Sequence, residues 1–234
     1  MSIALTQSHG LSAIVLLMLK LITATSLLLS APVLFSFLPQ SSSKTSRGLF
    51  EGETDIGSTR KGSTVYDSTK GEYRVGGGGA DMWGAADDFH FGWVRLSGDV
   101  TLTADVRFPS DGGTIPLKKA VLIVRQSLDP GAPYADVAIH GDGHITLQYR
   151  EAQGGPTADV TSAEHGSTRL RIERKGDQFI SYAGPADGKL AATGPVKIVL
   201  HDPVYVGIGM CAHKADGMET AIFSNVKIER PSAK

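Results

Sequence analysis

The chain has 234 residues and a formal net charge of −1, so it lacks the broad electrostatic field that attracts nucleic acid or anionic lipid. Its 28 glycines, its modest aromatic content and the absence of long apolar periodic stretches after the N-terminal segment indicate short strands joined by turns. One all-β domain can take up everything after that segment.

The first forty residues differ from the rest of the chain. From Leu11 to Leu38 the sequence is almost wholly apolar, with Lys20 as its one charge, and it can cross the roughly 30 Å hydrocarbon core of a membrane as a helix. Read from Met18, a short basic start precedes the apolar stretch as in a signal peptide, so we expect Met18 to be the true start. Residues 1–40 are predicted to be a signal peptide or an uncleaved membrane anchor; the alternative is a buried helix of the domain.

This segment predicts export. We expect the protein to be periplasmic, extracellular or membrane-anchored, with its domain outside the cytoplasm and in contact with the membrane only through the N-terminal segment. Residues 41–53 are interpreted as a linker and residues 54–230 as a β-sandwich domain. The single Cys211 lies in the apolar run VYVGIGMCA, which predicts a buried, inert thiol and no internal disulfide.

Apolar and polar residues alternate from about Phe50 onward. In GDVTLTADVRF, residues 98–108, the apolar side chains share one face and Thr, Asp and Arg share the other, as in a half-buried strand. Similar runs, separated by Gly, Pro and Asp, cover residues 119–127, 134–140, 144–150, 168–176, 177–184, 196–200, 204–211 and 218–228. Nine or more strands with no helical period between them predict two packed antiparallel sheets.

The hairpin of residues 134–140 and 144–150 can be read residue by residue. Its loop, residues 141–143 (GDG), fixes the register, so Asp136 is predicted to face Gln148, with Cβ atoms about 5 Å apart. Eight side chains then share one face: Tyr134, Asp136, Ala138, His140, His144, Thr146, Gln148 and Arg150. The opposite face is predicted to point into the core and holds Ala135, Val137, Ile139, Ile145, Leu147 and Tyr149.

We expect the polar face of this hairpin to be exposed to solvent. Any sandwich has a polar outer face, so plain solvation is one interpretation. The residue types favour a binding site, because planar donors and acceptors beside aromatic rings suit the hydroxyls and apolar faces of sugars. Arg125, on the preceding strand, is predicted to point the same way and to pair with Asp136.

The runs GADMWGAADDFHFGWVRLSGDVTLTADVRF, KKAVLIVRQSLDPGAPYADVAIHGDGHITLQYRE, RLRIERKGDQFISYAG and VYVGIGMCAHKADGMETAIFSNVKI carry a family resemblance. The chain resembles small bacterial domains of the concanavalin A-like lectin/glucanase superfamily, and more narrowly an uncharacterised group named after a "regulation of enolase" protein. The resemblance covers roughly Thr54 to Glu229. It implies a jelly-roll sandwich whose concave sheet forms a groove, and a glycan as the class of ligand.

Two tryptophans and one histidine extend the predicted groove. Trp83 is expected either at the groove rim, as a stacking surface, or in the core, whereas Trp93 is expected in the core. His90 alternates with Phe89 and Phe91; if both Phe rings fill the core, His90 faces the groove.

The sequence carries no recognisable catalytic motif. It has no strand with the paired carboxylates of a retaining glycosidase, and Asp136 and His140 are about 13 Å apart along one strand, too far for a hydrogen-bonded dyad. Nucleophile-elbow, zinc-helix and phosphate-loop motifs are also missing, and Gly76–Gly79 fits a turn or strand kink. We predict no metal at His140, His144 and His213. The superfamily resemblance allows a calcium ion, since members often carry one, but no Asp/Asn-rich coordination loop supports it.

The leading hypothesis is a non-catalytic carbohydrate-recognition domain without a cofactor, whose partner is a carbohydrate or another extracellular ligand and not nucleic acid. Its predicted ligand-binding residues are Trp83, His90, Arg125, Tyr134, Asp136, His140, His144, Gln148 and Arg150. A second hypothesis is a hydrolase or lyase acting on sugars, with Asp136, His140 or His144 as acid or base. A third is a structural or protein-interaction sandwich.

Overall fold

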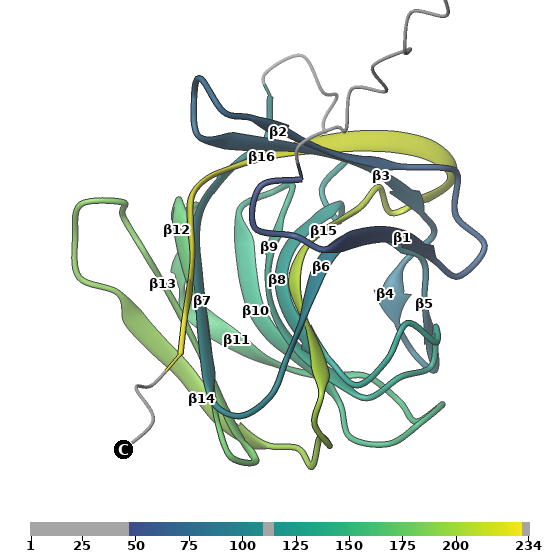
Figure 1. Ribbon diagram of the computed structural model, residues 1–234, viewed down its shortest axis with the longest axis vertical. Helices are drawn as coiled ribbons and strands as arrows, with labels where there is room; N and C mark the ends of the chain where they lie inside the picture. The colour runs from purple at the N-terminus through teal and green to yellow at the C-terminus, as the bar shows by residue number, and fades with distance from the viewer. Residues whose placement is uncertain (1–46, 110–114, 231–234) are drawn as a thin grey trace, which may run out of the picture. The chain divides into compact units, whose positions relative to one another are not determined.

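Two antiparallel sheets of seven strands each form the part of the chain that the computed structural model describes, residues 47–109 and 115–230. Sheet 1 contains, in spatial order, β1 (Gly52–Ile56), β6 (Phe89–Leu96), β15 (Val204–Cys211), β8 (Lys119–Arg125), β9 (Tyr134–His140), β10 (His144–Arg150) and β11 (Ala158–His165). Sheet 2 contains β14 (Ala191–Lys197), β13 (Gln178–Gly184), β12 (Arg169–Lys175), β7 (Val100–Arg107), β16 (Lys214–Glu229), β3 (Glu72–Gly79) and β2 (Ser63–Asp67). A separate ribbon pairs β4 (Met82–Trp83) with β5 (Ala86–Asp87). The predicted all-β sandwich of two antiparallel sheets is confirmed (Figure 1).

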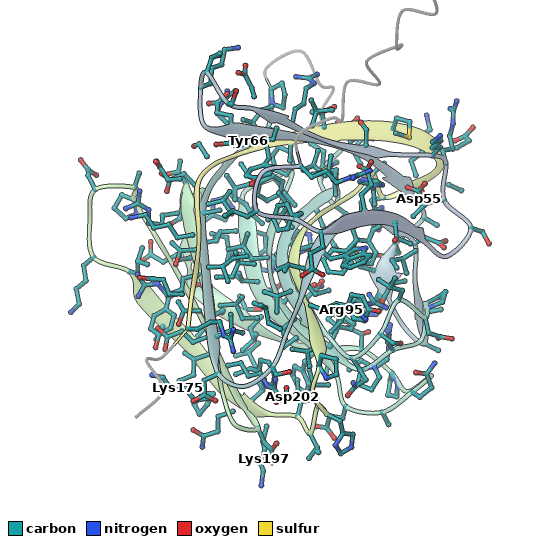
Figure 2. All side chains as sticks on the ribbon, in the orientation of Figure 1. Asp55, Tyr66, Arg95, Lys175, Lys197 and Asp202 are labelled. Carbon is teal, nitrogen blue, oxygen red and sulfur yellow. The ribbon has the colours of Figure 1, made fainter. Side chains whose placement is uncertain are left out.

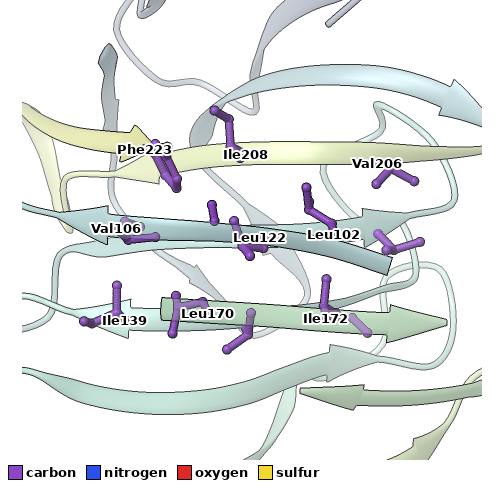
Figure 3. Close-up of a cluster of buried hydrophobic side chains, with 14 of the residues drawn as sticks. Leu102, Val106, Leu122, Ile139, Leu170, Ile172, Val206, Ile208 and Phe223 are labelled. Atoms are coloured by element: carbon purple, nitrogen blue, oxygen red, sulfur yellow. The ribbon is translucent and has the colours of Figure 1, made fainter. Parts of the chain in front are cut away.

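The main core lies between the two sheets and is built from alternate residues of their strands. Figure 3 shows part of it, with side chains that are at most 7% exposed: Leu102, Val106, Leu122, Ile139, Leu170, Ile172, Val206, Ile208 and Phe223. Full burial of such a side chain stabilises the fold by about 1.5 to 3 kcal/mol. Phe50 also belongs to this core and β1 begins at Gly52, so the sandwich starts before residue 54.

The β9–β10 hairpin has the register that its loop predicts. Asp136 pairs with Gln148, Ala138 with Thr146 and Tyr134 with Arg150. Gly143 adopts a left-handed backbone with φ of 91°, which a residue without a Cβ adopts at little cost. The side chains predicted to point into the core do so: Ala135, Val137, Ile139, Ile145 and Leu147 are buried there, and Tyr149 packs against them.

The other face of the hairpin is buried too, so the prediction that it is exposed to solvent is wrong. Tyr134, Asp136, Gln148 and Arg150 are all at most 2% exposed. The β4–β5 ribbon lies on the side of sheet 1 that faces away from sheet 2 (Figure 1). A second apolar cluster fills the space beneath this covering: Ile56, Met82, Phe89, Phe91, Val121, Ile123, Tyr134, Ala138 and Cys211. Strands β8 and β9 are consequently buried on both faces.

Cys211 is fully buried in this second cluster, as predicted. Burial raises the pKa of its thiol to about 12, which keeps the sulfur in its unreactive protonated form at neutral pH. The described residues include no helix that is long and apolar enough to cross a membrane. The N-terminal segment predicted to direct export, residues 1–40, lies outside the described residues.

Candidate functional site

The outer face of the β9–β10 hairpin has two ends with different chemistry. At one end the side chain of Arg150 forms a two-pronged ion pair with Asp87 of the ribbon, with Nη2–Oδ1 at 2.7 Å and Nη1–Oδ2 at 2.8 Å. It also donates to the carbonyl oxygens of Gly84, Pro130, Ala132 and Gly155 and to Oγ1 of Thr157. Arg150 therefore fastens three covering segments to sheet 1 at once.

Arg125 and Tyr134 belong to the same anchor. Arg125 donates to Asp87 Oδ2 at 3.2 Å and to the carbonyl of Ser127 at 2.7 Å, so the predicted pairing of Arg125 with Asp136 is wrong. The guanidinium of Arg150 lies 5.0 Å from the centre of the Tyr134 ring. All three side chains are completely buried. They were predicted as exposed ligand-binding residues, but no ligand reaches them while the covering segments stay in place.

At the other end the covering is incomplete and leaves a pocket of about 270 Å³. Its floor comes from the hairpin, through His140, His144, Thr146 and Gln148. Its walls come from four other segments, through Asp81, Trp83, Leu117, Lys119, Asp159 and His213. Four of the predicted site residues, Trp83, His140, His144 and Gln148, are thus brought together.

The walls of the pocket carry an ion pair and an exposed ring. Nζ of Lys119 lies 2.6 Å from Oδ1 of Asp81, and Nε2 of His213 lies 3.4 Å from the other oxygen of that carboxylate. Nζ of Lys119 also lies 5.8 Å from the centre of the Trp83 ring. Trp83 is 43% exposed, so much of its ring is open to a ligand. His213 has a φ of 52°, a strained backbone of the kind that clusters at functional sites.

The hairpin contains buried polar atoms, in and beneath the floor of the pocket, that have no hydrogen-bond partner. Among the described residues five such side-chain atoms occur, and four of them belong to the hairpin: both carboxyl oxygens of Asp136, Nδ1 of His140 and Oε1 of Gln148. Asp136 does not line the pocket, but it lies beside Gln148 in the register. An unpaired buried polar atom costs about 1 to 3 kcal/mol, so this set requires an explanation in terms of a ligand, water or an unusual charge state.

Burial also changes the charge of these groups. It raises the pKa of the Asp136 carboxyl well above its usual range, which favours the neutral acid. Burial, together with the positive charge of Lys119, lowers the pKa of His140 to about 4, so the imidazole is neutral at pH 7. The rings of His140 and His144 have their centres 5.5 Å apart. The described residues contain no group of three His, Cys, Asp or Glu side chains able to hold a metal ion.

His90 does not face this pocket, and its prediction as a groove residue is wrong. Phe89 and Phe91 point into the outer cluster, so the alternation turns His90 the opposite way, toward sheet 2. Its Nδ1 lies 2.7 Å from Oδ1 of Asp55 (labelled in Figure 2) and its Nε2 lies 3.1 Å from Oγ1 of Thr64 on β2. His90 therefore ties the two sheets together. Trp93, predicted in the core, packs half-buried against the outer cluster.

The sequence reasoning missed Asp81, Lys119 and Asp159 as pocket residues. The alternation of the run KAVLIVR contains a signal for one of them: Lys119 and Arg125 are six residues apart and so share a face. Once Arg125 is assigned to the outer face, Lys119 follows it there. Asp159 is the residue opposite Gln148 on β11, and no local pattern in the sequence announces that pairing.

No protein-family model matches this chain, and no curated protein has a matching sequence. Among solved structures it is similar to a functionally unknown protein from Saccharomyces cerevisiae, with a TM-score of 0.57 and 18% identity over 78% of this chain and 97% of that one. It is also similar to arcelin-5, a lectin-like defence protein from Phaseolus vulgaris, with a TM-score of 0.49 and 10% identity over 75% and 97% of the two chains. The β-glucanase of Bacillus licheniformis has a TM-score of 0.46 and 10% identity over 76% and 92%. The yeast protein shares the fold of this chain.

Proposed function

We propose that this protein is a carbohydrate-recognition domain that holds a sugar in the pocket over the β9–β10 hairpin. The observation that carries the proposal is the exposed Trp83 ring beside buried, unpartnered polar atoms of His140 and Gln148. An aromatic ring offers a stacking surface for the apolar face of a pyranose. The amide and imidazole groups then match the hydroxyls, which both donate and accept hydrogen bonds.

The size of the pocket supports a small ligand or the end of a chain. Its volume of about 270 Å³ is slightly below the roughly 300 to 1,000 Å³ typical of small-molecule sites. Of the two carboxylates that line it, Asp81 is engaged by Lys119 and His213. Asp159 alone does not make the acid pair that glycosidases use, which favours binding over cleavage.

The proposal includes the location and the family. We infer that residues 1–40 direct export or anchor the chain, so that the domain meets extracellular or periplasmic glycans. The support is the apolar composition of residues 11–38. Membership of the group named after the "regulation of enolase" protein remains a prediction from the sequence resemblance.

A glycan array on the full chain, followed by calorimetric titration of the strongest ligand, tests the proposal. We expect Trp83→Ala to weaken binding about tenfold or more, since central aromatic contacts commonly contribute over 1.4 kcal/mol. The matched control is Trp93→Phe, because Trp93 does not line the pocket. Equal affinity of the wild type and Trp83→Ala would exclude this pocket as the sugar site.

A sugar-cleaving enzyme is the second candidate, and a specific observation favours it. His140 is neutral at pH 7 and its ring lies 5.5 Å from that of His144, so one imidazole is available as a base. The array ligands should therefore be incubated with the protein and assayed for new reducing ends and for unsaturated products. Turnover that is lost in His140→Gln would establish the enzyme in place of the binding domain.

A further inference from the structure

A buried acid and a buried amide lie side by side beneath the pocket. Asp136 and Gln148 are directly opposite each other on β9 and β10, so their Cβ atoms are about 5 Å apart. Asp136 is completely buried and Gln148 is 2% exposed. Both oxygens of Asp136 and Oε1 of Gln148 have no partner. Carboxyl and amide oxygens that are cut off from water destabilise the fold when they have no donor. A protonated carboxyl beside the amide oxygen removes this cost, because it supplies the donor.

The surroundings determine which group carries that proton. Burial raises the pKa of Asp136 well above its usual range, and Asp87 adds to the shift, even though Lys119, the nearby backbone N–H of Gln148 and Arg125 oppose it. That N–H does not reach hydrogen-bond geometry with either carboxyl oxygen. The charged or titratable groups that act electrostatically on this carboxyl, or feel its charge, are Lys119 and Arg125 from β8, Asp87 from β5, Tyr134 from β9 and Arg150 from β10. Arg125 and Arg150 are already satisfied by Asp87 and by backbone carbonyls. They therefore leave Asp136 without a hydrogen-bonded cation.

We infer that Asp136 donates its proton to Oε1 of Gln148 and thereby holds the Gln148 N–H₂ group toward the pocket, where it binds the carbonyl oxygen of an N-acetylated sugar. This inference rests on the proposed function and names the ligand class of that site. Asp136 acts as a positioning residue, since it does not line the pocket. Its proton removes the choice that a free amide has between presenting its oxygen and presenting its nitrogen.

The charge of the pocket walls distinguishes between two sugar groups that accept a hydrogen bond from an amide N–H, a uronate carboxylate and an acetamido carbonyl. Counted with neutral histidines, the lining has the carboxylates of Asp81 and Asp159 against the single ammonium of Lys119, a formal charge of −1. A uronate carboxylate is repelled by that excess. An acetamido group is neutral, its carbonyl accepts from Gln148, and its methyl group fits the exposed apolar surfaces of Trp83 and Leu117.

The first test measures the proton directly. In the full chain labelled with ¹³C at aspartate carboxyl carbons, the Asp136 signal, assigned by its loss in Asp136→Asn, should have the shift of a protonated acid at pH 7. It should titrate only at higher pH. An ionised Asp136 at pH 7 in a protein that binds glycans would overturn this inference and leave the proposed function intact.

The second test measures the consequence for binding, with oligomers of N-acetylglucosamine as the probe. Asp136→Asn keeps a hydrogen-bond donor beside Gln148 and should bind within about threefold of the wild type. Asp136→Leu removes that donor and should bind at least tenfold more weakly, even though it also removes a buried acid that has no partner. Gln148→Glu should also lose at least tenfold. Equal binding by the Asn and Leu variants, both verified as folded by circular dichroism, would overturn the positioning role.

The pH profile separates positioning from packing. The folded-state pKa of Asp136 is raised. Below that pKa the carboxyl is protonated and holds Gln148 in the orientation that binds the sugar, so affinity should fall as pH rises through it. Asp136→Asn should show no such fall. Tighter binding of uronate or plain hexose oligomers than of N-acetylglucosamine oligomers would overturn the ligand class. Failure of every glycan to bind would overturn the proposed function, and this inference with it.

Discussion

The two ends of the β9–β10 hairpin show how the same face of one ribbon serves two purposes. At the anchor end, Arg150 and Arg125 have their donors matched to Asp87 and to backbone carbonyls. At the pocket end, Asp136, His140 and Gln148 retain unpaired atoms next to an opening. Residue type does not distinguish the two ends, because both hold charged and planar groups. The two ends differ in whether their buried polar groups have hydrogen-bond partners.

The anchor end should therefore be where the fold is most sensitive to substitution. Arg150→Ala leaves Asp87 buried beside Arg125 and strips several carbonyls of their donor, so unfolding should become easier by about 3 to 5 kcal/mol. Urea denaturation of the full chain, followed by circular dichroism, measures this loss. Arg95→Ala is the control, since Arg95 is exposed (labelled in Figure 2) and its loss should cost under about 0.5 kcal/mol. Similar losses in both variants would remove the distinction between the two ends.

A pH effect on stability is expected from the pocket end. His140 has a folded-state pKa of about 4 against about 6.5 in an unfolded chain, so the unfolded state takes up the proton first. The neutral imidazole contributes its full stability above about pH 6.5 and loses it as pH falls toward 4, by on the order of 2 to 3 kcal/mol. Denaturation curves between pH 4 and 7 should show the wild type losing this amount of stability relative to His140→Gln as pH falls. Parallel curves would show that His140 is not held neutral by burial.

The smallest effect on stability is expected at Gln148. Gln148→Leu removes the buried Oε1 but also takes away the inferred acceptor of the Asp136 proton, so the free energy of unfolding should fall by only about 1 to 1.5 kcal/mol, the net value of one hydrogen bond. Gln148→Leu, measured by the same urea denaturation, should nevertheless lose sugar binding. A destabilisation as large as that of Arg150→Ala would mean that Gln148 is part of the scaffold.

The sequence predicts which side chains share each face of the hairpin, but not that other segments of the chain cover the polar face. Alternation separates Asp136 and Gln148 from Val137 and Leu147, and the three-residue loop sets the register; both follow from local geometry. Whether the polar face meets water depends on the β4–β5 ribbon, whose Asp87 reaches Arg125 and Arg150 from 38 and 63 residues away in the sequence. Pairing over such separations leaves no periodic signal.

Two sequence features nevertheless bear on the covering. Strand β8 has the sequence KAVLIVR, with five consecutive apolar residues. Such a run is typical of a strand buried on both faces. His90 shows the complementary case: it does alternate with Phe89 and Phe91, but both Phe rings fill the outer cluster and not the main core. In a sheet with two apolar faces, periodicity alone does not say which face is the main core.

A fluorescence titration of Trp83 tests the central claim, that the pocket end binds a sugar. In Trp93→Phe, Trp83 is the one remaining tryptophan, because the chain has two. Titration with the strongest array ligand should shift its emission saturably, with the Kd found by calorimetry, and Gln148→Leu in the same background should abolish the shift. Sugar binding without any change in Trp83 emission, or with full affinity in the Gln148→Leu variant, would contradict the account.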